Sequence, residues 1–336
     1  MNASSRRLFL AGSAMAGLSG VAGLPSVAAG QTNPPQPAAP AASPVVVMNS
    51  GEDSLSFLDP TTYREIERRP IGREPHHWAL TPDRRELVIG NAVGNELVFL
   101  DAITGRTLRR IERFSNPYHL LFSPDGRFLV VAELRLDAVA VYRAADYQLL
   151  TRIRIPRMVS HIVISPDSRF AYLTVQQTGR LIEVDLEQLQ HTWTMDVGPE
   201  PAGIILAADN RTLGVAIMGS DHLAMVDRLE RRIVNRVRTG RGAHAFPQLF
   251  DEGTLFISNR VDNTVSQLDH RTLQVLRSFP IPGGPDCLAL TPDRRELWIT
   301  GRVNHHVMVM DVATGQLKHR IRVGRSPHGI YIAPHA

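Results

Sequence analysis

The chain has 336 residues, of which 43% are hydrophobic and 21% charged, a balance typical of a soluble globular protein and not of a disordered or membrane-embedded one. Its formal net charge is +4, to which Arg6 and Arg7 contribute two, so charge gives no argument for nucleic acid as a partner. Cys287 is the single cysteine of the sequence, which excludes an intramolecular disulfide.

The N-terminal segment has the features of an export signal. Arg6 and Arg7 are followed by Leu-Phe-Leu, by a mildly apolar run and by the small residues Val-Ala-Ala, which end at residue 29. This order resembles a twin-arginine signal, which directs a folded protein across the membrane. We therefore predict a signal peptide over residues 1–29 and a proline- and alanine-rich linker over residues 30–43. The mature protein is expected to be periplasmic, with no stable membrane insertion after cleavage.

A motif that recurs with a period of 42 residues organises the rest of the chain. Ser/Thr-Pro-Asp motifs, or their decayed forms, place an aspartate at each step: Asp83, Asp125, Asp167, Asp209, Asp251 and Asp293. Between these turns β-branched residues alternate with polar ones, so one period predicts strands over 118–122, 128–131, 138–142 and 148–153. Four short strands in each period of about 40–45 residues are typical of the blades of a β-propeller.

The two ends of the repeat region complement each other. Residues 323–334 (VGRSPHGIYIAP) repeat the pattern of residues 71–82 (IGREPHHWALTP) and predict an inner strand over 329–333, whereas the region begins with a second strand over 45–48. One C-terminal and three N-terminal strands would then complete one blade and close the ring without an open edge. The predicted fold is all-β, a seven-bladed β-propeller over residues 44–336 with four-stranded antiparallel blades.

The repeated motifs resemble the YVTN-type β-propeller repeat family. They are Ser-Pro-Asp-Gly-Arg from Ser123, Asp-x-x-Thr-Gly from Asp101 and Asp311, and Gly-Arg-x-Pro-His-Gly from Gly324. The resemblance covers residues 44–336 and implies a propeller related to the one that carries d-type haem in cytochrome nitrite reductase, and to lactonase-like propellers. Because propellers host unrelated activities, the resemblance implies the fold more strongly than the function.

Histidines gather at the start of the predicted inner strands, which line the central channel. Neutral imidazoles are good ligands for zinc, copper or iron. We predict a metal site at the channel mouth from these side chains and one neighbouring acid: His77, His119, His161, His244, His328 and Glu133. Since side chains alternate along a strand, His76 and His77 are not both expected to point at the axis.

Arginine recurs at one position of the repeat, shortly before the histidines, in four blades: Arg73, Arg157, Arg241 and Arg325. Guanidinium groups suit carboxylates or phosphates. Histidine flanked by arginine would offer a carboxylated tetrapyrrole an axial nitrogen and partners for its acid groups. The sequence contains no Cys-x-x-Cys-His motif, so a haem in this protein would be bound non-covalently.

Three functions follow from these features. The leading hypothesis is an exported binding or assembly protein that holds a metal ion or a haem-like, carboxylated tetrapyrrole at the channel mouth. The alternatives are a periplasmic scaffold that binds another protein, and a metal-assisted, lactonase-like hydrolase, for which only Asp286 and Glu133 offer acidic ligands. Cys287 is expected to be buried and inert. The sequence does not decide between a binding protein and an enzyme.

Overall fold

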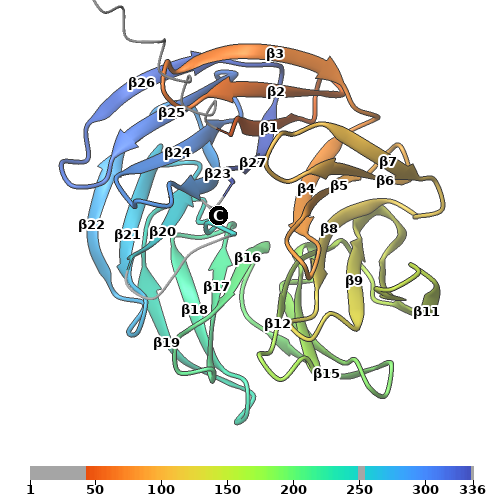
Figure 1. Ribbon diagram of the computed structural model, residues 1–336. Coiled ribbons are helices and arrows are strands. Elements are labelled where there is room, and N and C mark those ends of the chain that lie inside the picture. The colour runs from red at the N-terminus through yellow and green to blue at the C-terminus, as the bar shows by residue number, and fades with distance from the viewer. Residues whose placement is uncertain (1–42, 249–253, 334–336) are drawn as a thin grey trace, which may run out of the picture. The chain divides into compact units, whose positions relative to one another are not determined.

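Seven β-sheets surround a central axis in the computed structural model, which describes residues 43–248 and 254–333 (Figure 1). Apart from these sheets, the described residues form two short 3-10 helices, η1 (Leu134–Leu136) and η2 (Gln176–Thr178). The prediction of an all-β, seven-bladed propeller is confirmed. The predicted signal peptide and residues 30–42 of the predicted linker lie outside the described residues.

Each blade runs from an inner strand at the axis to an outer strand at the rim. Five blades consist of four consecutive strands each. The first two contain β4 (Pro75–Leu80), β5 (Glu86–Asn91), β6 (Glu96–Asp101) and β7 (Thr107–Ile111), and β8 (Pro117–Phe122), β9 (Phe128–Glu133), β10 (Ala138–Arg143) and β11 (Leu149–Arg154). The other three contain β12 (Val159–Ile164), β13 (Phe170–Val175), β14 (Arg180–Asp185) and β15 (Gln190–Asp196), then β16 (Pro201–Leu206), β17 (Thr212–Ile217), β18 (His222–Asp227) and β19 (Arg232–Arg238), and finally β23 (Pro285–Leu290), β24 (Glu296–Gly301), β25 (His306–Asp311) and β26 (Leu317–Arg322). The bounds of β8 to β11 differ from the predicted ones by at most two residues.

The Pro-Asp motifs form the turns between the first and second strands of the blades. In the first of them the Thr81 hydroxyl donates a hydrogen bond to Asp83 over 2.7 Å and accepts one from the backbone N–H of Glu86 over 3.0 Å. Ser123 makes the same pair of bonds, to Asp125 over 2.6 Å and from the Phe128 N–H over 2.9 Å. A short polar side chain that bonds its own backbone favours a tight turn, so these aspartates have a structural role.

The ring closes as predicted. The C-terminal strand β27 (Pro327–Tyr331) pairs antiparallel with β1 (Val45–Asn49), and the sheet continues through β2 (Ser54–Asp59) and β3 (Arg64–Pro70). Two hydrogen bonds tie this blade to the next one: the Trp78 indole N–H donates to the Ile330 carbonyl over 2.8 Å, and the Tyr331 hydroxyl donates to the Ala102 carbonyl over 3.0 Å. Both ends of the propeller are therefore held in one sheet.

One sheet departs from the four-stranded pattern within the described residues. It contains β20 (Thr254–Asn259), β21 (Thr264–Asp269) and β22 (Val275–Pro280), and its innermost position is taken by backbone near His244. Ala243 forms an isolated bridge with Asn259, and the His244 N–H donates to the Ser258 carbonyl over 2.8 Å. This segment therefore occupies the place of an inner strand with only a few ladder bonds.

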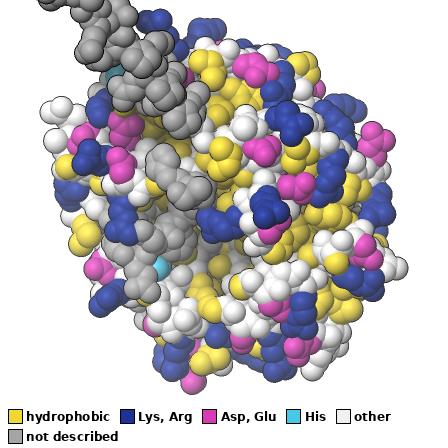
Figure 2. All heavy atoms as spheres, in the orientation of Figure 1, with side chains coloured by type: hydrophobic (Ala, Val, Ile, Leu, Met, Phe, Trp, Pro, Cys, Tyr) yellow, Lys and Arg dark blue, Asp and Glu magenta, His cyan; other side chains and the backbone are white. Residues whose placement is uncertain are grey.

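The hydrophobic core lies between neighbouring sheets. One cluster, for example, joins Val45 and Val47 of β1 to Trp298, Val307 and Val309 of the preceding blade. Among the described residues, no helix is long and apolar enough to cross a membrane. Figure 2 shows acidic and basic side chains interspersed over the visible face, which agrees with the small net charge of the chain.

Candidate functional site

A register shift at the start of each inner strand turns consecutive side chains toward the axis. In β4 the pairing with β5 shifts between Pro75 and Trp78, and β8, β12, β16 and β23 show the same shift. A bulge interrupts the alternation of side chains along a strand. The expectation that His76 and His77 cannot both face the axis is therefore wrong: their ring centroids lie 5.0 Å apart, and both rings contact His328.

Six buried imidazoles form one continuous cluster around the axis. From His77 the ring centroids lie 4.6 Å from His328, 4.5 Å from His119 and 5.2 Å from His161. The His161 ring lies 5.5 Å from that of His244, which in turn lies 6.2 Å from His328. All six, including His76, are at most 7% exposed. The structure thus brings together the five histidines predicted as metal ligands, and adds His76 to them.

Buried hydroxyl groups fix the inner strands against one another. The Thr174 hydroxyl donates to the Ala202 carbonyl of the next blade over 2.8 Å, and the Thr300 hydroxyl donates to the His328 carbonyl over 2.9 Å. The Ser258 hydroxyl bonds the Asp286 carbonyl over 2.7 Å in the same way. Each hydroxyl comes from the second strand of one blade and holds the inner strand of the next. The backbone around the cluster is therefore positioned by three equivalent contacts.

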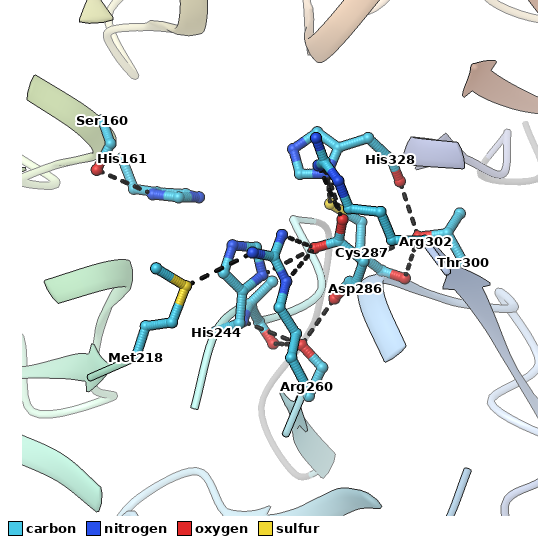
Figure 3. A network of polar contacts seen from close by, with 12 residues as sticks. Ser160, His161, Met218, His244, Arg260, Asp286, Cys287, Thr300, Arg302 and His328 are labelled. Carbon is cyan, nitrogen blue, oxygen red and sulfur yellow. Dashed lines mark hydrogen bonds and ion pairs between the residues drawn. The ribbon is translucent and has the colours of Figure 1, made fainter. Parts of the chain in front are cut away.

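Asp286 lies at the centre of a network of polar contacts (Figure 3). It is completely buried, and its two carboxylate oxygens lie 3.0 Å from His244 Nδ1 and 2.7 Å from His328 Nδ1. Arg260 and Arg302 also donate to it, Arg302 over 3.2 Å. Burial alone would raise the pKa of Asp286, but Arg260 and His328 hold it well below its usual range. The group is therefore a carboxylate that can only accept hydrogen bonds.

The hydrogen bonds of His328 determine which of its nitrogens carries the proton. Two groups compete for His328 Nδ1: Asp286, which only accepts, lies 2.7 Å away, and Arg302, which only donates, lies 3.0 Å away. The shorter contact with Asp286 favours a proton on Nδ1 and a free lone pair on Nε2. That lone pair faces His77, whose Nε2 atom lies 3.2 Å away. Two nitrogens bound at 2.0–2.1 Å to one tetrahedral ion are separated by about 3.3 Å. The spacing of these two nitrogens corresponds to a direct N–H···N hydrogen bond, and it also fits a shared metal ion.

A second chain of hydrogen bonds assigns the tautomer of His161. The Thr174 hydroxyl donates to Ala202, so the Ser160 hydroxyl must donate to Thr174, and its oxygen accepts from His161 Nδ1 over 3.2 Å. His161 Nε2 is then the unprotonated nitrogen. It is buried and has no hydrogen-bond partner among the described residues, and the same is true of Nδ1 of His76 and of His119. Buried polar atoms usually have a hydrogen-bond partner, so these nitrogens are available to a water molecule, an ion or another ligand.

The burial of the cluster keeps its imidazoles neutral. Burial lowers the pKa of His119 and of His244 to about 3, and that of His328 to about 4. It also lowers the pKa values of His76, His77 and His161 well below the usual value, with repulsion from neighbouring imidazoles as a further cause. Neutral imidazoles are the form that binds metal ions, and no proton has to leave the six rings at neutral pH.

A cavity of about 310 Å³ adjoins the cluster. Its lining includes one residue of a single repeat position from every blade: His77, His119, His161, Gly203, Ala245, Cys287 and Gly329. From this level the cavity runs along the axis past apolar side chains such as Leu121 and Ile204, as far as Pro166 and Asn210 in the turns of the opposite face. His77, His119 and His161 therefore lie at one end of a partly open cavity, deeper than the channel mouth that the sequence predicted for them.

The other predicted site residues lie elsewhere. The arginines Arg73, Arg157, Arg241 and Arg325 are exposed, and Arg241 pairs with Asp262 over 2.6 Å. Glu133 is buried and accepts two hydrogen bonds from Arg152, over 2.7 and 3.0 Å. None of these five belongs to the described residues that line the cavity.

Arg260 and Arg302, which both donate hydrogen bonds to Asp286, were not predicted from the sequence. One signal could have found them: they are separated by one period of 42 residues, and each directly follows the end of a second strand. Cys287 is buried, as expected, and its Sγ atom lies 3.7 Å from His328 Nδ1. Burial, followed by the charge of Asp286, raises the pKa of its thiol well above the usual value. The thiol is therefore protonated at neutral pH.

The fold and the axial cluster define the class of protein, a seven-bladed β-propeller with buried histidines around its channel. The sequence matches the family model of the YNCE-like β-propellers over residues 1–336, and the chain belongs to this family. The resemblance to YVTN-type propellers is thereby confirmed. A search of curated proteins gave no significant match.

Solved structures share the fold at low sequence identity. A functionally unknown protein from Desulfotomaculum acetoxidans DSM 771 is 17% identical with a TM-score of 0.74, over 87% of this chain and 99% of the other. The dihydro-heme d1 dehydrogenase NirN in complex with DHE is 15% identical with a TM-score of 0.64, over 90% of this chain and 78% of the other. Hydrazine synthase of Kuenenia stuttgartiensis is 20% identical with a TM-score of 0.59, over 77% of this chain and 90% of the other.

Proposed function

We propose that the chain is an exported binding protein that holds a transition-metal ion on the propeller axis through neutral imidazoles. The single observation that carries this proposal is the pair of Nε2 atoms of His77 and His328, 3.2 Å apart, with the lone pair of His328 directed at its neighbour. His161 and His119 lie next to this pair, and each has a buried nitrogen without a hydrogen-bond partner among the described residues. Imidazole ligands suit zinc, copper, nickel and iron.

Charge also supports a metal ion bound mainly by nitrogen. Both oxygens of Asp286 accept hydrogen bonds, from Arg260 on one side and from Arg302 and His328 on the other, so it acts behind the ligands and not as one of them. A lactonase-like site needs acidic ligands, and the two acidic residues considered for it, Asp286 and Glu133, are both paired with arginine. We therefore favour a binding protein over a metal-assisted hydrolase.

A haem-type tetrapyrrole is the second candidate, supported by the likeness to NirN in complex with DHE. The described lining of the cavity contains no arginine or lysine that could pair with the acid groups of such a ligand. The four arginines expected for this role are exposed. Because of these two observations, we favour the simple metal ion over the tetrapyrrole as the ligand.

Export rests on the sequence of residues 1–29, whose arginine pair, apolar run and small-residue end have the order of a twin-arginine signal. A signal of this type carries a protein that has already folded, and a metal bound on the axis would then be acquired before export. We propose a periplasmic location on this basis.

The test is a metal titration of the purified protein. The metal-free chain is dialysed against Zn²⁺ or Cu²⁺, and its content is measured by elemental analysis beside an absorption spectrum of the protein as isolated. We expect at least one ion per chain in the wild type and a loss of binding in the double variant His77→Ala/His328→Ala. The control is His191→Ala, which changes an exposed histidine of the outer strand β15.

The outcomes separate the candidates. The proposal would be overturned if the wild-type protein retained no tightly bound metal ion, or if the double variant bound metal as well as the wild type does. A Soret band in the protein isolated from its own host would replace the simple ion by the tetrapyrrole. Circular dichroism of each variant verifies that the propeller is folded.

A further inference from the structure

We infer that the cavity beside the histidine cluster is a second binding site, which takes a small, uncharged and largely apolar molecule of about the size of a fused two-ring aromatic compound. Such a molecule would lie along the axis, with one end against His77, His119 and His161. The inference concerns the cavity and its walls, so it holds with or without a metal ion on the imidazoles.

The unequal size of the side chains around the axis creates the cavity. In the ring of equivalent positions, three blades contribute His77, His119 and His161, whereas the other four contribute the small residues Gly203, Ala245, Cys287 and Gly329. The space therefore lies opposite the imidazoles. Sequence alone shows the imbalance between the blades, and the structure shows that it leaves about 310 Å³ next to the rings.

The two glycines of this ring keep the wall in place. A Cβ atom at Gly203 would lie 2.3 Å from the His244 carbonyl oxygen, and one at Gly329 would lie 2.5 Å from the His76 carbonyl oxygen. Since backbone oxygens cannot yield as a flexible side chain does, no larger residue fits these positions without a shift of the neighbouring strand. Close backbone contacts therefore require glycine at these two of the seven equivalent positions around the axis.

The walls select for an uncharged ligand. Among the described residues that line the cavity there is no aspartate, glutamate, lysine or arginine, and the walls below the histidines consist mainly of Trp78, Leu121, Ile162, Ile204, Leu288 and other apolar side chains. A charged molecule would lose its hydration without gaining a partner of opposite charge, which costs several kcal/mol or more. The polar side chains in the lining are neutral: the three imidazoles and Cys287 at one level, and Asn210 and Gln248 elsewhere in the cavity. They suit single donor or acceptor atoms on an otherwise apolar molecule.

The volume sets the size class. An apolar cavity of about 150 Å³ in another protein holds one benzene molecule. The present cavity has about 310 Å³, so a molecule with two fused rings fits and leaves little empty space. Pockets for small molecules begin at about 300 Å³.

The experiment uses indole as the uncharged probe and indole-3-acetate as its charged counterpart, each titrated into the metal-free full-length chain and followed by calorimetry and by the melting temperature. We expect indole to bind and to raise the melting temperature, with indole-3-acetate at least tenfold weaker. Ala245→Leu fills the cavity and should weaken indole binding at least tenfold. Ala313→Leu, which adds the same atoms at an exposed turn, should leave indole binding unchanged.

Two further variants keep the result decisive. Leu206→Trp fills the cavity from a partly exposed position and serves if Ala245→Leu does not fold. His328 is a proposed metal ligand that does not line the cavity, so His328→Ala should lose metal and retain indole, whereas Ala245→Leu should retain metal and lose indole. Failure of the metal site and failure of the cavity site are therefore distinguishable. The inference would be overturned if indole left the melting temperature unchanged or if indole-3-acetate bound as tightly as indole. It would also be overturned if Ala245→Leu and Leu206→Trp both bound indole as tightly as the wild type.

Discussion

His77 Nε2 and His328 Nε2 lie 3.2 Å apart, although the two residues are 251 positions apart in the sequence. His77 belongs to β4, and His328 belongs to β27, the strand that completes the blade begun by the N-terminal strands. The same strand therefore closes the ring and completes the histidine cluster. A propeller whose last strand is displaced loses a ligand as well as an edge contact.

Replacing Asp286 by asparagine should weaken metal binding 10- to 100-fold while the number of ions at saturation stays the same. The amide can donate a hydrogen bond to Nδ1 of His328, which would favour the wrong tautomer and place a proton on Nε2. The measurement is the Zn²⁺ affinity of Asp286→Asn, by competition with a chelator. Asp262→Asn, which alters a partly exposed partner of Arg241, is the control.

If Asp286 only supported the fold, the asparagine variant would lose stability and keep its affinity for zinc. Asp286→Glu gives a second comparison, because it keeps the carboxylate and should recover part of the affinity if the variant accepts the longer side chain. An affinity of Asp286→Asn equal to that of the wild type would contradict the positioning role.

Acid should destabilise the metal-free protein from about pH 6.5 downward. Unfolded histidine binds a proton with a pKa near 6.5, whereas burial keeps the pKa of His119 and His244 at about 3 and that of His328 at about 4. Between these limits the unfolded chain binds more protons than the folded one, so the free energy of unfolding falls as the pH falls. Each such histidine contributes about 1.4 kcal/mol per pH unit.

Urea unfolding at pH 7.5, 6.5, 6.0, 5.5 and 5.0 measures this slope above the range in which most carboxylates titrate. His119→Asn should reduce it by about 1.4 kcal/mol per pH unit. His191→Asn, at an exposed position, should not change the slope. A free energy of unfolding that stays constant between pH 6.5 and 5.0 would show that the buried imidazoles accept protons in the folded state.

The repeat made most of the fold predictable, because a period of 42 residues fixes which residues of different blades lie at the same height. It also placed His77, His119 and His161 at the start of inner strands, where the structure shows them lining the cavity. His76 was excluded because strict alternation ignores the bulge between Pro75 and Trp78. The period of 42 residues aligns Arg260 with Arg302, but it does not show which acid each arginine meets. The pairs Asp286–Arg260 and Glu133–Arg152 join different strands, and only the folded chain shows them.

Glu133→Gln should leave metal binding unchanged and lower the free energy of unfolding by about 1–3 kcal/mol. Although Glu133 was predicted as an acidic ligand, its two oxygens accept hydrogen bonds from Arg152, and the variant breaks a pair whose carboxylate is completely buried. Elemental analysis and urea unfolding measure the two effects. A loss of metal in a variant that remains folded would restore Glu133 as a ligand.

Tyr331→Ala should cost about 3–5 kcal/mol of unfolding free energy and should also weaken metal binding. The ring of Tyr331 is almost completely buried, packs edge-on against Trp78 at 4.9 Å and donates a hydrogen bond to the Ala102 carbonyl of the next blade. The truncation leaves a cavity at the junction where β27 completes the ring, so the added mobility reaches His328 three residues earlier in the same strand. Val303→Ala, at a side chain that is 76% exposed, is the control and should change stability by no more than about 0.5 kcal/mol.

Urea unfolding and zinc affinity are measured on both variants. Loss of stability in Tyr331→Ala without any loss of zinc affinity would separate ring closure from the assembly of the histidine cluster.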